Sequence, residues 1–131
     1  MILFLVRANL SVAMGIVIVS TYPDKKSISK VAHVVVEKKL AACVNYTKIN
    51  SIYSWKGKIE DVEEFLALFK TTAKSKYKLK DVIAKSHPYD VPEIVELKMD
   101  ATNVPYMKWL EESTLGGKPK KRNHSSKRRN P

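Results

Sequence analysis

Cysteine is nearly absent from this chain of 131 residues, in which Cys43 is the only one. A single cysteine excludes an intrachain disulfide framework and a zinc site built on several thiolates. Long apolar runs are absent as well. The run over residues 1–6 is too short to cross a bilayer, and it lacks the basic start of a secretory signal. We therefore expect a domain with no membrane partner, located in the reducing cytoplasm.

Arginine is missing from residues 14–117, although the whole chain has a formal net charge of +11. Residues 118–131 hold seven lysines and arginines and no acidic residue, whereas residues 14–117 hold 16 basic and 13 acidic residues. The excess charge thus belongs to a basic tail that has nothing apolar to bury, and its composition predicts disorder. A nucleic-acid-binding fold carries its basic patch within the fold, so positive charge in a tail is weak evidence for such a function. Non-specific nucleic-acid binding through the tail is therefore kept only as a secondary alternative.

The spacing of apolar residues predicts a strand, a helix, two strands, a helix, a strand and a last short helix. The expected ranges are 15–21, 27–40, 42–59, 62–72, 76–85, 93–99 and 104–115. With right-handed crossovers, this order gives an α+β fold, the ferredoxin-like split βαβ sandwich (βαββαβ plus a C-terminal helix). Residues 14–117 form the predicted domain. Residues 1–13 are expected to be an N-terminal extension, with a short extra strand as the alternative.

The predicted strands have two features that bear on assembly. Val44 and Tyr46 share one side and Tyr53 and Trp55 the other, so we expect a bulge or bend near Lys48. Alternation over 93–99 predicts a strand with one firmly buried face, formed by Val95, Leu97 and Met99. Apolar residues occupy both faces of 62–72, and two helices cannot cover both. We therefore expect copies of the chain to cover the remainder.

Five short motifs follow one another along the chain. They are Ser-Thr-Tyr-Pro-Asp at 20–24, Lys-Lys-Leu-Ala-Ala-Cys-Val-Asn at 38–45, Ser-Ile-Tyr-Ser-Trp-Lys-Gly-Lys at 51–58, Phe-Lys-Thr-Thr at 69–72 and His-Pro-Tyr-Asp-Val-Pro-Glu-Ile at 87–94. With Tyr106, Trp109 and Leu110, they make residues 14–115 resemble the CutA family of divalent-cation tolerance proteins. The resemblance implies a tight homotrimer, a cytoplasmic location in prokaryotes, and a link to copper and other divalent metals. The architecture is similar to that of nitrogen-regulatory PII proteins, which suggests signalling by analogy of fold alone.

His87 is the leading candidate for a metal ligand, because imidazole binds Cu(II) and Zn(II) and a proline stiffens its loop. The resemblance implies a copper site made by a Cys late in the first strand and a His-His pair before Pro-Tyr. This chain has Ser20 and Ser86 at two of those positions. We expect copper(II) or another divalent cation to bind weakly at His87, helped by Asp90 or Glu93. The alternatives are a structural His87 and solvated carboxylates.

Other candidate residues have plainer interpretations. Cys43 begins a strand and is expected to be a buried structural cysteine, with a metal or redox role as the alternative. His33 falls on the polar side of a helix and is expected to be solvated, and His124 lies in the tail. Four aromatic residues are expected in the core or a subunit interface, with an aromatic cleft as the alternative: Tyr53, Trp55, Tyr89 and Trp109.

An enzyme is the competing class of function, since acylphosphatases share this general fold. Their chemistry needs a guanidinium group to cradle phosphate, and residues 14–117 contain none. A Gly-rich phosphate loop and a Ser/His/Asp set are missing there too. We therefore expect a non-catalytic, trimeric protein linked to divalent metal (copper) tolerance, with signalling as an additional hypothesis.

The composition also predicts high thermal stability. Residues 14–117 contain no Gln, three Asn and one Cys. Few thermolabile residues together with many Lys and Glu are typical of proteins from hot environments, where ion-pair networks gain weight. We predict a calorimetric melting temperature above about 90 °C for the full chain. A transition in the ordinary mesophilic range would contradict this prediction.

Overall fold

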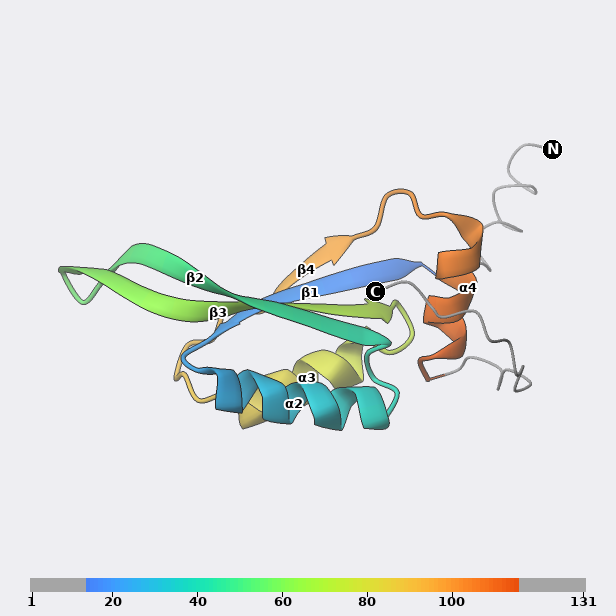
Figure 1. Ribbon diagram of the computed structural model, residues 1–131, viewed down its shortest axis with the longest axis horizontal. Coiled ribbons are helices and arrows are strands. Elements are labelled where there is room, and N and C mark those ends of the chain that lie inside the picture. The colour runs from blue at the N-terminus through green and yellow to red at the C-terminus, as the bar shows by residue number, and fades with distance from the viewer. Residues whose placement is uncertain (1–13, 116–131) are drawn as a thin grey trace.

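The computed structural model describes residues 14–115, so the predicted extension (1–13) and tail (118–131) lie outside the described residues. Its elements are β1 (Gly15–Tyr22), α2 (Lys25–Glu37), β2 (Cys43–Trp55), β3 (Lys58–Thr72), α3 (Lys76–Ser86), β4 (Val95–Lys98) and α4 (Val104–Glu112). The strands form one antiparallel sheet in the order β2-β3-β1-β4. Figure 1 shows α2 and α3 against one face of the sheet and α4 at the end where β1 begins. The predicted ferredoxin-like α+β fold is confirmed.

The hydrophobic core lies between the sheet and helices α2 and α3. Alternate strand residues point into it, and each of the two helices contributes one apolar stripe. Its most deeply buried members, each at most 1% exposed, are Ile16, Ile18, Tyr22, Ile28, Val35, Ala41, Ala67, Phe69, Leu79 and Ile83. In the described part of the chain, no helix is both long and apolar enough to cross a membrane.

Helix α2 begins two residues before the predicted range of 27–40 and ends three residues before the end of that range. Asp24 is its N-cap, and Oδ1 accepts a hydrogen bond of 2.8 Å from Ser27 N. Lys39 adopts a left-handed φ of 59°, and the N–H of Leu40 bonds back to Val35 O. The left-handed residue stops the helix before Leu40. The Leu40 side chain is nevertheless buried, because the chain turns back towards the core.

The β2–β3 hairpin pairs without interruption along its whole length, starting with Cys43 opposite Lys70. Its two-residue turn consists of Lys56 and Gly57, with φ values of 51° and 80°. Left-handed backbone at both turn residues gives a twist that matches the paired strands. The turn falls inside the predicted strand range 42–59, so β2 ends earlier than predicted, at Trp55, and β3 begins at Lys58 instead of the predicted 62.

The bulge predicted near Lys48 is absent. Lys48 lies opposite Phe65, and Phe65 also pairs with Tyr22, the last residue of β1. In this row the sheet narrows from three strands to two, and Figure 1 shows the hairpin continuing beyond α2 and α3. The apolar side chains change face here because the helical cover ends, while the strand itself keeps its register.

The face of β4 that was predicted to be buried is exposed in the single chain. Val95 and Leu97 are 43% and 50% exposed, and Glu96 faces the helices instead. Lys76 and Lys80 of α3 bind the Glu96 carboxylate at 2.7 and 2.8 Å and lower the pKa of Glu96 to about 2. The alternation marked an apolar side correctly, but alternation alone does not tell which side the helices cover.

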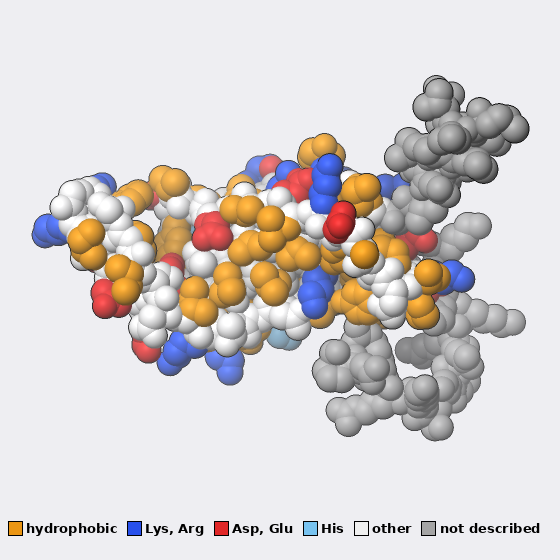
Figure 2. Space-filling view, turned by 90° about the horizontal axis from the view of Figure 1, so that it is seen from above, with side chains coloured by type: hydrophobic (Ala, Val, Ile, Leu, Met, Phe, Trp, Pro, Cys, Tyr) orange, Lys and Arg blue, Asp and Glu red, His pale blue; other side chains and the backbone are white. Residues whose placement is uncertain are grey.

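We call the sheet surface opposite α2 and α3 the open face. Its apolar residues are Val17, Val19, Leu66, Leu68, Val95 and Leu97. Figure 2 looks onto this side and shows hydrophobic side chains gathered along the middle of the molecule. Soluble monomers rarely expose a contiguous apolar surface of this kind. The open face is thus consistent with the predicted assembly of several copies.

The assigned core predicts that two alanine substitutions in β3 differ in their effect on the free energy of unfolding. Phe69→Ala removes a fully buried ring and should lower the free energy of unfolding by about 3–5 kcal/mol. Ile59→Ala, at a side chain that is 74% exposed, should change it by less than about 0.5 kcal/mol. Chemical denaturation of both variants measures the difference, and equal losses would contradict the assigned core.

Candidate functional site

His87 follows α3 directly and fastens the next loop to the end of β1. Its ring stacks on Tyr22, with 4.3 Å between the ring centroids. Nε2 lies 2.9 Å from Thr21 O and 3.2 Å from Ser20 Oγ, and Nδ1 accepts a hydrogen bond of 3.1 Å from Tyr89 N. Because Nδ1 accepts, the proton of the neutral ring is assigned to Nε2, which donates to Thr21 O.

Both ring nitrogens of His87 are thus engaged within the fold. Burial disfavours the charged ring and lowers the pKa of His87 below its ordinary value of 6.5, although Thr21 O and the charge of Glu64 act in the opposite direction. A proton or a metal ion at Nδ1 has to displace the Tyr89 N–H. These hydrogen bonds give His87 a structural role, which was the alternative to a metal ligand in the sequence analysis.

The other residues predicted for a metal site are not gathered around the His87 ring. Ser20 is buried beside it, but Ser86 Oγ donates back to Val82 O at 2.7 Å. Asp90 and Glu93 are exposed. Within residues 14–115, no three His, Cys, Asp or Glu side chains come close enough together to hold a metal ion. The geometry offers one imidazole and scattered carboxylates.

Glu64 is a site residue that the sequence reasoning missed. It is only 6% exposed, and its Oε2 accepts a hydrogen bond of 2.6 Å from the Tyr89 hydroxyl. Burial and the adjacent carboxylate raise the pKa of Tyr89. One signal was present in the sequence, because Glu64 has the same strand phase as Leu66 and Leu68 on the apolar open face. A run of neighbouring acidic residues hid it, since such runs are usually solvated.

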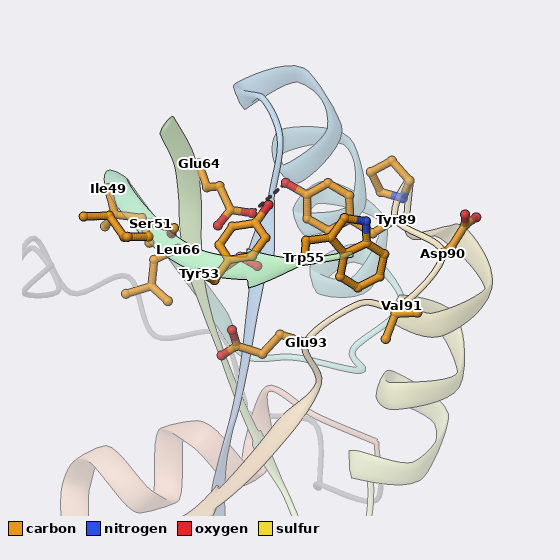
Figure 3. A pocket seen from close by; sticks show the side chains of 13 residues that line it. Ile49, Ser51, Tyr53, Trp55, Glu64, Leu66, Tyr89, Asp90, Val91 and Glu93 are labelled. Atoms are coloured by element: carbon orange, nitrogen blue, oxygen red, sulfur yellow. Dashed lines mark hydrogen bonds between the residues drawn. The ribbon is translucent and has the colours of Figure 1, made fainter. Parts of the chain in front are cut away.

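A groove of about 770 Å³ lies between the outer half of the hairpin and the loop after His87. Its lining residues are Thr21, Ile49, Ser51, Ile52, Tyr53, Trp55, Glu64, Leu66, Pro88, Tyr89, Asp90, Val91 and Glu93. Figure 3 shows the Glu64–Tyr89 hydrogen bond within it and the Asp90 carboxylate pointing away from the other side chains. An aromatic cleft was the alternative to a core or interface position for four aromatic residues, and three of them, Tyr53, Trp55 and Tyr89, line this groove. The fourth, Trp109, lies in α4 against Tyr106, with 5.5 Å between the ring centroids.

The remaining candidates stand apart from the groove. Cys43 is only partly buried, contrary to expectation, because it begins the edge strand β2, and its Sγ lies 3.6 Å from Asn45 Oδ1. His33 is exposed as predicted, with Nδ1 2.8 Å from Ser29 O. His124 falls outside the described residues.

Comparison with known proteins defines the family. The sequence model of the family described as "CutA1 divalent ion tolerance protein" matches residues 16–113. The chain belongs to the CutA1 family. Divalent-cation tolerance protein CutA of Thermotoga maritima is 39% identical over 100 residues, which is 76% of this chain and 99% of that protein. Protein CutA of Homo sapiens is 43% identical over 95 residues, or 72% of this chain.

Solved CutA1 structures share the fold. CutA1 from Oryza sativa superposes with a TM-score of 0.76 at 34% identity, covering 81% of this chain and 98% of that one. CutA1 from Pyrococcus horikoshii gives 0.73 at 38% identity, covering 76% and 97%. The chain spans about half the length of the curated mammalian relatives, 53% in the human case. In this CutA1 chain, the motif at 87–94 supplies both the His87 anchor and one wall of the groove.

The His87 anchor predicts a pH dependence of stability. The pKa of His87 is lowered in the folded chain, whereas the unfolded ring keeps its ordinary value of 6.5. The unfolded chain therefore binds more protons in this range, and the stabilisation is present above pH 6.5 and lost as pH falls through the folded-state pKa. Chemical denaturation across this range should show the decline in the full chain and a shallower decline in His87→Asn. His33→Asn, at an exposed histidine, is the control that should retain it, and an unchanged decline in His87→Asn would refute the anchor.

Proposed function

We propose that this chain is a non-catalytic, homotrimeric protein of divalent-cation tolerance that binds copper(II) or another divalent cation weakly. The observation that carries the proposal is the match of residues 16–113, nearly the whole described fold, to the CutA1 family. The relative from Thermotoga maritima is described as a divalent-cation tolerance protein and is covered almost completely. In this proposal the protein binds the cation as cargo or as a signal and does not use it for catalysis.

The open face supports the assembly. Val95 and Leu97 are half exposed on an edge of the sheet where the described chain has no further element to cover them. Burying such side chains against other copies is favourable at about 25 cal/mol for each Å² of apolar surface. The number of copies, three, comes from the family resemblance. In a closed ring of identical chains, the same surface is buried in every copy.

Weak cation binding follows from the chemistry at His87. Copper(II) prefers imidazole and thiolate donors in fixed geometry, and Ser20 and Ser86 offer hydroxyl oxygens at the corresponding positions. A cation at His87 Nδ1 has to break the 3.1 Å hydrogen bond from Tyr89 N. Asp90 and Glu93 are exposed, and no three candidate ligands gather among residues 14–115. The residues present therefore suit a loosely held ion.

The non-catalytic part of the proposal is supported by the residues available. Residues 14–117 contain no arginine to cradle a transferred phosphate, so an acylphosphatase-like activity lacks its central group. Signalling is supported only by the analogy of fold, and nucleic-acid binding only by the charge of residues 118–131. We propose the cytoplasm as the compartment, although the relative from Archaeoglobus fulgidus is described as periplasmic.

Light scattering and copper(II) titration calorimetry on the full chain test this proposal together. The expected mass is roughly 45 kDa, three times the 14.9 kDa chain, with and without copper(II). Copper(II) should bind weakly and be released as pH falls through the lowered pKa of His87, below about pH 6, because protonated imidazole does not coordinate metal. His87→Ala should abolish binding and leave the mass unchanged, and His33→Ala is the matched control.

Two results would contradict the proposal. A monomeric mass at micromolar concentration would refute the assembly. Tight copper(II) binding that survives His87→Ala would place the ligands elsewhere, with Cys43 and His33 as the next residues to substitute.

A further inference from the structure

Glu64 and Lys70, two charged residues of β3, stand at opposite ends of an apolar stretch on the open face. The stretch consists of Leu66 and Leu68, which have the same strand phase as both charges. Lys70 pairs directly with Val17, and directly paired residues lie on the same face of a sheet. Six residues of strand separate the two charges by about 20 Å. Within one chain they are therefore too far apart to form an ion pair.

Neither charge has an ionic partner among residues 14–115. The ion pairs there join Glu96 to two lysines and Asp81 to another. Glu64 is only 6% exposed and accepts a hydrogen bond from Tyr89, while Lys70 is partly buried. Burying a carboxylate is unfavourable unless a cation or several hydrogen bonds replace the lost water. Covering the open face with other copies removes the water that remains, so the assembly has to supply the missing partners.

The distribution of charge on the open face indicates which groups these partners are. Among residues 14–115, alternation places two lysines on this side of the strands, Lys58 and Lys70. Lys58 is exposed beside the hairpin turn, on the same side of the apolar stretch as Glu64. Lys70 is at the other end. Two copies that pack their apolar stretches together, with the β3 strands in opposing directions, bring the positive end of one to the negative end of the other.

We propose that Lys70 of each copy pairs with Glu64 of the next copy in the homotrimer. The pair neutralises both charges within the contact and allows the leucines beside it to be buried. Around a closed ring, each copy gives its Lys70 to one neighbour and receives the Lys70 of the other at Glu64, so every such charge is paired. Tyr89 holds the Glu64 carboxylate in place through its hydroxyl, at 2.6 Å. This inference rests on the proposed assembly and adds to it the interaction that sets the relative direction of neighbouring copies.

A double-mutant cycle on association tests the pair. Sedimentation of the full chain over a concentration series, in enough urea to dissociate it partly, gives the association constant of each variant. Glu64→Gln keeps the size and an acceptor for Tyr89, and Lys70→Gln removes the other charge. Each should weaken association by about tenfold or more, because it leaves the remaining charge buried and unpaired. The double variant should associate within about twofold of the weaker single variant, since the second substitution has no pair left to break.

The cycle isolates the contact between copies. Residues 64 and 70 of one chain are about 20 Å apart, and substitutions at such a separation act additively. A coupling between them therefore arises only where two copies meet. The matched control cycle combines Lys70→Gln with Glu63→Gln, at an exposed residue on the other face of β3, and it should be additive within about twofold.

Two results would overturn the proposal while the assembly stands. The first is additive effects of Glu64→Gln and Lys70→Gln in variants that still form the assembly, because the two charges are then not in contact. The second is unchanged association of Glu64→Gln, because the carboxylate then has no partner in a neighbouring copy. A monomeric mass of the unmodified chain is a separate outcome, which would refute the assembly and the pair together.

Discussion

The position at which β1 ends controls the architecture of this CutA1 chain. Tyr22 is the last residue of β1 to pair with β3, and Pro23 follows it without an N–H to continue the ladder. From that row onward, none of the other strands and helices described within residues 14–115 pairs with or covers the hairpin. His87 fastens the loop after α3 to the same place, through the Tyr22 ring and Thr21 O. The groove arises between the free part of the hairpin and this fastened loop.

His87 is subject to two chemical demands that compete. As an anchor, the ring is neutral, with Nε2 directed at Thr21 O and Nδ1 accepting from Tyr89 N. In the metal-binding role that we propose, it would have to release one of these bonds. Tyr89 then links the anchor to the groove, because its backbone bonds His87 and its hydroxyl bonds Glu64. Disturbing the His87 ring is therefore expected to reach the buried carboxylate through a single residue.

The local sequence was sufficient for most of the fold. The type and order of all seven elements followed from apolar spacing, and the N-cap at Asp24 and the turn at Gly57 depend on residues whose chemistry acts over a few neighbours. The same locality explains the errors. Alternation identified an apolar side of β4 that was expected to be buried, and the phase change near Lys48 was interpreted as a bulge or bend. Both depend on which helices cover which part of the sheet.

The sequence by itself determined the elements, the family resemblance and the importance of the segment 87–94, because these depend on short-range patterns. Only the tertiary structure decided that Glu64 is buried beside Tyr89, that Tyr53 and Trp55 line the groove without Trp109, and that both His87 nitrogens are occupied. The physical reason is sequence separation. Residues 21, 64 and 87 come from three different elements, and only the pairing of β1 with β3 and the packing of α3 bring them together.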